Sequence, residues 1–90
     1  MAVIYKANGE KQEVTPENGK DFKLKQLQKI VGGLIDYVHL GNGEIMVFND
    51  EGKLIGLPYN REATERFQKA FQTDDFIVGD VLICKDNEVE

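Results

Sequence analysis

Turn signals in which glycine accompanies asparagine or aspartate recur along the chain and divide it into short segments. Asn8-Gly9, Gly41-Asn42-Gly43 and Asp50-Glu51-Gly52-Lys53 each separate runs that are rich in strand-forming residues. Asn-Gly pairs accept the positive φ angles of tight hairpin turns, so they favour antiparallel neighbours. The chain therefore predicts hairpins, with helices set apart from them, rather than a strict alternation of parallel strands and helices.

The expected strands are short and flank these turns. An opening hairpin and a meander of three strands account for most of them, and the last part of the chain adds a final strand or a bent strand pair. The predicted strands are Ala2–Tyr5, Gln12–Thr15, Leu34–Leu40, Glu44–Asn49, Leu54–Leu57, Phe76–Val78 and Val81–Cys84. The tail, Asp86–Glu90, is expected to fray.

Two amphipathic segments predict helices. Apolar residues recur at steps of three and four over Phe22–Val31, where Asp21 is the expected N-cap and Gly32-Gly33 the stop. The second helix is expected over Arg61–Phe71, with Asn60 as its N-cap.

The expected fold class is α+β, an antiparallel sheet of about five to six strands packed on two helices, and residues 1–90 form a single domain. A chain of this length has a thin core, so burial against a second copy is attractive and a homo-oligomer is expected. The predicted core consists of Leu24, Leu27, Ile30, Ile35, Val47, Phe67, Phe71, Val81 and Ile83.

The charge of the chain is unevenly placed. The net charge is −5, and residues 46–90 account for it with five Lys and Arg against ten Asp and Glu. This acidity disfavours binding to duplex DNA. No apolar run is long enough for a membrane span, and no signal peptide is expected. With a single cysteine, the cytosol is the expected compartment.

No catalytic or metal-binding set is recognisable, and no cofactor is expected. His39 is the only histidine and is interpreted as structural or surface, although it is the base that a nucleophilic Cys84 would need. Cys84 ends an apolar run and is interpreted as a small buried hydrophobe. The acidic pairs Asp50-Glu51 and Asp74-Asp75 are interpreted as solvated turns. The chain is therefore predicted not to be an enzyme.

The segment that leads into the second helix is the candidate ligand site. A helix start favours anions, Tyr59 offers a ring for a base, and Arg61 offers a forked donor set. The alternative is a hydrophobic staple of Tyr59 and a simple cap by Asn60. Gly32 and Gly33 either stop the first helix or allow a ligand to approach the backbone. The candidate ligand-binding residues are Gly32, Gly33, Tyr59, Asn60 and Arg61.

A second candidate is the lysine-rich face of the first helix. Such lysines usually serve only to solvate a helix, and they can also gather an acidic partner or a small anion. The residues concerned are Lys20, Lys23, Lys25 and Lys29.

Three runs together carry a family resemblance. Leu27–Ile35 contains Val-Gly-Gly, residues 50–64 contain Glu-Gly-Lys and Gly-Leu-Pro, and Ile77–Ile83 contains Val-Gly-Asp. Together they resemble a family of small uncharacterised domains in phages and mobile elements, and the likeness covers most of the chain.

The phage setting implies a location in the host cytoplasm and an anti-defence role. By analogy with that setting, the protein is expected to sequester an anionic nucleotide immune signal, a cyclic ADP-ribose isomer or a cyclic dinucleotide, without catalysis. The alternative is an inhibitor that binds a host defence or regulatory protein through its acidic surface.

Overall fold

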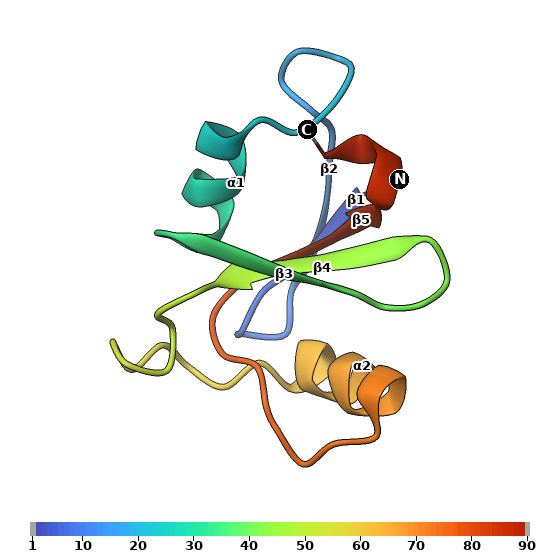
Figure 1. Ribbon diagram of the computed structural model, residues 1–90. Coiled ribbons are helices and arrows are strands. Elements are labelled where there is room, and N and C mark those ends of the chain that lie inside the picture. The colour runs from blue at the N-terminus through green and yellow to red at the C-terminus, as the bar shows by residue number, and fades with distance from the viewer. Residues whose placement is uncertain (1, 90) are drawn as a thin grey trace.

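A computed structural model describes residues 2–89, and its centre is one antiparallel sheet (Figure 1). The strands lie in the order β2-β1-β5-β4-β3, and each neighbouring pair is antiparallel. The elements are β1 (Ala2–Tyr5), β2 (Lys11–Val14), α1 (Leu24–Val31), β3 (Ile35–His39), β4 (Glu44–Asn49), α2 (Arg61–Phe71), β5 (Val81–Lys85) and the 3-10 turn η1 (Asp86–Glu88). The α+β fold with two helices is therefore confirmed.

The two helices cover opposite faces of the sheet, with α1 above it and α2 below it in Figure 1. Successive residues of β5 point to opposite faces. Leu82 and Cys84 join the core on the α1 side, whereas Val81 and Ile83 join the core on the α2 side. The sheet thus has apolar residues buried on both faces, which explains the continuous apolar run in its central strand.

The predicted third strand of the meander is wrong. Residues Leu54–Leu57 lie in a series of turns, because the Ile55 N–H donates to Glu51 O and the Leu57 N–H donates to Gly52 O. These local bonds replace the ladder that a strand would need. Phe76–Val78 is also not a strand, and Val78 forms only an isolated bridge with Tyr59.

The start of the first helix was also predicted wrongly. Helix α1 begins at Leu24, its N-cap position is Lys23, and the side chain of Lys23 makes no capping bond. Phe22 is instead fully buried, bridges to Val89, and donates its N–H to Glu88 O at 2.6 Å. This contact also orders the tail as far as Val89, which sequence patterns predicted to fray; Glu90 lies outside the described residues.

The predicted core is confirmed in its centre and wrong at its margins. Leu27, Val47, Val81 and Ile83 are buried, and Ile30, Ile35 and Phe67 are half-buried. Leu24 and Phe71 are 55% and 44% exposed. Both lie in a terminal turn of a helix, where the contact with the sheet ends.

Among residues 2–89, three polar side chains are buried, and they tie the loops to the sheet and helices: Asn49, Asn60 and Thr64. Thr64 Oγ1 accepts the Ile77 N–H at 2.9 Å and donates to Ile77 O at 3.2 Å. Asn49 Nδ2 donates to Val31 O at the end of α1, and Asn49 Oδ1 accepts the Glu51 N–H. Neither helix in residues 2–89 has the length and apolar character of a membrane span.

Candidate functional site

Asn60, one of the sequence-predicted site residues, is fully committed inside the protein. Its Oδ1 accepts the Ala63 N–H at 3.0 Å, which is the predicted N-cap. Its Nδ2 donates to Tyr5 O and Gly79 O, both at 2.8 Å, and the residue is 1% exposed. The amide therefore joins α2, β1 and the loop before β5, and it has no face left toward solvent.

Tyr59 and Arg61 flank Asn60 and are both at the surface. The Tyr59 ring is 54% exposed and lies 6.1 Å from the Phe76 ring, measured between centroids. The Arg61 side chain is 84% exposed, with Nε 3.7 Å from Glu65 Oε2. An exposed pair of this kind contributes little to stability. The roles of Tyr59 and Arg61 as ligand contacts stay predictions.

The two glycines of the predicted site end the first helix. Gly32 adopts a left-handed conformation at the C-cap, and a Cβ on Gly33 would lie 2.9 Å from Asn49 Nδ2. Gly32 and Pro58 line a common pocket of about 420 Å³. The end of α1 therefore lies beside the turn before α2. The other three predicted site residues do not line this pocket: Tyr59, Asn60 and Arg61.

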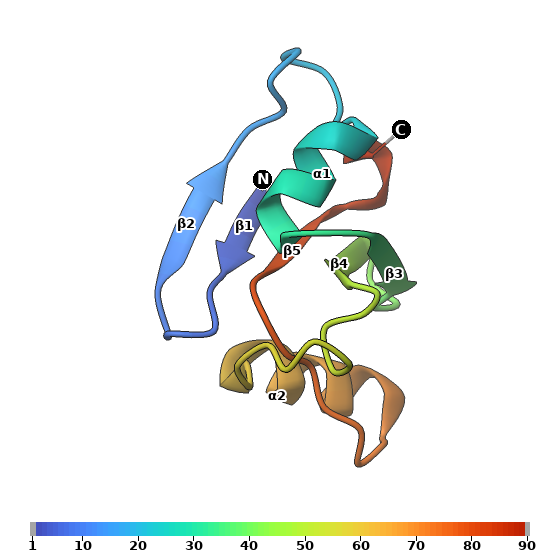
Figure 2. The ribbon, with the colours of Figure 1, turned by 90° about the vertical axis from the view of Figure 1, so that its left-hand side faces the viewer.

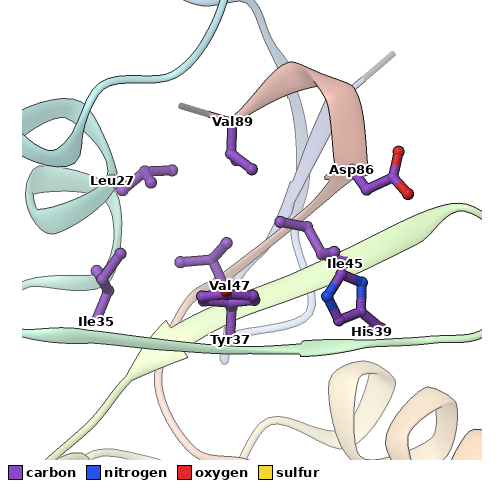
Figure 3. Close-up of a pocket in the computed structure, with 8 residues that line it drawn as sticks. All are labelled: Leu27, Ile35, Tyr37, His39, Ile45, Val47, Asp86 and Val89. Carbon is purple, nitrogen blue, oxygen red and sulfur yellow. The ribbon is translucent and has the colours of Figure 1, made fainter.

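A different concavity lies on the α1 face of the sheet, between α1 and η1 (Figure 3). Its volume is about 290 Å³, close to the lower end for small-molecule sites. Apolar side chains surround it, and polar groups stand at one end. Its lining residues are Leu27, Ile35, Tyr37, His39, Ile45, Val47, Asp86 and Val89.

The polar end of this pocket combines an aromatic ring, an imidazole and a carboxylate. Tyr37 and His39 stand on the same face of β3, and their rings meet edge to face with centroids 5.8 Å apart. Asp86 comes from η1 on the other side of the opening (Figure 3). Tyr37 is 53% exposed, so its ring is available for stacking.

A second concavity of about 500 Å³ adjoins the first, because Leu27 and Ile35 line both. Its other lining residues are Phe22, Lys23, Leu24 and Lys25. The two adjoining concavities are here named together the α1–β3 groove. It has a ring end at Tyr37, His39 and Asp86 and a lysine end at Lys23 and Lys25.

Sequence reasoning missed the ring end of the groove. His39 was assigned only a structural or surface role, and Asp86 was placed in a frayed tail. The alternation of β3 was a usable signal, since Ile35, Tyr37 and His39 must share one face of a strand. The position of η1 beside them depends on the contact between Phe22 and Val89. These residues are far apart in the sequence, so no local sequence pattern predicts their contact.

The surroundings of Cys84 do not activate its thiol as a nucleophile. The Cys84 thiol is fully buried under the α1 face, and burial raises its pKa to about 12, with Glu88 and Glu44 adding to the effect. A thiol with such a pKa is almost wholly protonated at neutral pH. Within residues 2–89, no three His, Cys, Asp or Glu side chains gather closely enough to hold a metal ion.

Fold and groove together define a small α+β domain with one sheet between two helices and an amphiphilic groove on one face. The chain belongs to the family described as "Domain of unknown function (DUF3846)", whose match covers residues 1–90. No curated protein and no solved structure matches the chain.

Proposed function

We propose that this protein binds an anionic nucleotide in the α1–β3 groove and does not convert it. The observation that supports the proposal is the adjacency of the two concavities, because the ring end and the lysine end share Leu27 and Ile35 in their linings. A nucleotide has the same division, with a flat base at one end and phosphate at the other.

The ring end offers what a base needs. The exposed face of Tyr37 can stack on a base, a contact worth about 1–3 kcal/mol in single-stranded nucleic-acid binding. The Asp86 carboxylate can accept hydrogen bonds from an exocyclic amine, and the His39 imidazole can donate or accept one. The apolar floor of Ile45 and Val47 excludes water beneath the ring.

The lysine end offers what phosphate needs. Lys23 and Lys25 line it, and both are exposed at the first turn of α1. The proposed anion contact therefore belongs to the lysine-rich face of the first helix. The proposed ligand is still a cyclic ADP-ribose isomer or a cyclic dinucleotide, of which the groove would hold one base and a neighbouring phosphate. In a phage such binding would remove an immune signal from the host.

Calorimetry against a panel of cyclic dinucleotides and cyclic ADP-ribose isomers tests the proposal. Tyr37→Ala should weaken binding of the positive panel member at least about fivefold, the lower limit of one stacking contact. Tyr59→Ala is the matched control, since Tyr59 is exposed to the same degree at a different place. Lys25→Ala should also weaken binding and reduce its salt dependence, whereas Lys69→Ala on α2 should do neither.

Three results would overturn the proposal or a part of it. One is the absence of binding to every panel member. Another is binding that depends on Tyr59 and Arg61 and is indifferent to Tyr37, which would place the ligand at the start of α2. Recovery of a chemically altered ligand after incubation would contradict binding without conversion.

A further inference from the structure

The loop between β4 and α2 presents two adjacent aliphatic side chains to solvent. Leu54 is 86% exposed and Ile55 is 60% exposed. The loop is nevertheless held in place by its own backbone hydrogen bonds, from the Ile55 and Leu57 N–H groups. Gly52 is also buried, and a Cβ at this position would lie only 2.9 Å from Val78 Cγ2. Leu54 and Ile55 together are here named the knob.

The surroundings of the knob are acidic. Asp36 and Asp50 line a shallow pocket together with Leu54, and Glu51 lies within the same loop. Lys53 is the one cationic residue among those that line this pocket. Its ammonium pairs with Asp75 and lies 4.2 Å from the Phe76 ring centroid. The free charge around the knob is therefore negative.

The lysine end of the α1–β3 groove has the opposite character. It is an apolar hollow in which Leu24 is 55% exposed. Its rim carries Lys25 and Lys23, and Lys23 Nζ lies 3.5 Å from Asp21 Oδ1, so the basic character of the rim rests mainly on Lys25. An apolar knob with an acidic rim complements an apolar hollow with a basic rim, and such charge complementarity fixes register and speeds association. Exposed apolar groups at both sites would be buried by the contact.

We infer that a second copy of this chain is the occupant, with the knob of one copy seated in the lysine end of the groove of the other. Helix α1 and the loop after β4 both lie on the side of the molecule that faces the reader in Figure 2. A twofold rotation can therefore make the contact reciprocal, which is the commonest symmetry of homo-oligomers. A contact between two knobs would bring acidic rims together and is disfavoured.

The docking has one consequence for ligand binding, which rests on the proposed function. A nucleotide phosphate and the knob of a second copy would meet the same lysines, so the ligand should shift the protein toward monomers. Self-association itself is measured without nucleotide, so it stands or fails independently of the ligand.

Sedimentation velocity on the unliganded protein tests the inference. The parent protein should dimerise at micromolar to submillimolar concentration. Leu54→Asp, which damages the knob, and Leu24→Asp, which damages the hollow, should each weaken dimerisation at least tenfold. Both residues are exposed in the single copy, so both variants should keep the parent circular dichroism spectrum and melting profile.

Mixing the two variants distinguishes the partner surfaces. Each variant alone lacks both contacts, but the mixture restores one contact, from the intact knob of Leu24→Asp to the intact hollow of Leu54→Asp. A heterodimer should form in the mixture and in neither solution alone. A parent that stays monomeric at submillimolar concentration, or a mixture that stays monomeric, would overturn the inference and leave the knob for a different protein partner.

Discussion

Replacing Asn60 by alanine should destabilise the protein far more than an ordinary loss of a helix cap. The alanine removes the acceptor for the Ala63 N–H and the donor to two carbonyl groups, Tyr5 O and Gly79 O. A lost N-cap costs about 1 kcal/mol. Each buried carbonyl that loses its partner adds about 1 kcal/mol or more. The sum is about 3 kcal/mol or more of the free energy of unfolding.

Such a loss is large for a chain of 90 residues, whose total stability is roughly 5–13 kcal/mol. Urea unfolding followed by circular dichroism measures it. Asn60→Asp separates the two parts of the effect, because it keeps the capping oxygen and loses both amide donors. Asn87→Ala, at an exposed asparagine in η1, is the matched control and should change stability by less than about 0.5 kcal/mol. A loss below about 1 kcal/mol for Asn60→Ala, or an Asn60→Asp variant as stable as the parent, would refute the reasoning.

Three further predictions concern the same framework. Thr64→Val should lower the free energy of unfolding by about 1–3 kcal/mol, because the Ile77 N–H loses its acceptor, and Thr64→Ser should restore most of it in the same urea assay. Gly33→Ala should cost about 1–3 kcal/mol in thermal melting, because the new Cβ meets Asn49 Nδ2 at 2.9 Å, and an unchanged melting temperature would contradict this. The pKa of Cys84 is raised to about 12 in the fold against about 8.5 in the unfolded chain, so its contribution to stability is full below about pH 8.5 and is lost as the pH rises toward 12. Cys84→Ala should therefore show a flatter fall in stability above pH 9, and parallel curves would contradict that account.

The elements that sequence patterns predicted well are those with local determinants. Helix α2 has the predicted bounds and cap, because Asn60 can accept the Ala63 N–H whatever surrounds it. The hairpin of β3 and β4 follows from its Gly-Asn-Gly turn. Leu54–Leu57 has strand-like composition, but a strand also needs a partner edge, and local bonds in the loop removed that possibility.

The groove depends on contacts that join distant parts of the chain. Phe22 is drawn out of the first helix by its contact with Val89 at the other end of the chain. That contact holds η1 in place, and η1 carries Asp86 to the opening beside Tyr37. The alternation of side chains along β3 could predict which face Tyr37 occupies, but it could not predict that Asp86 lies on the other side of the same pocket. This is why the sequence directed attention to the start of α2 instead.

The central claim is that the α1–β3 groove holds the base and phosphate of a nucleotide. Its most direct test is a titration of ¹⁵N-labelled protein with the panel member that binds, followed by assignment of the amide signals that move. The account predicts that the largest shifts fall in Lys23–Leu27, Ile35–His39 and residues 86–89. Shifts concentrated instead at Tyr59–Arg61, with the groove signals unmoved, would contradict it.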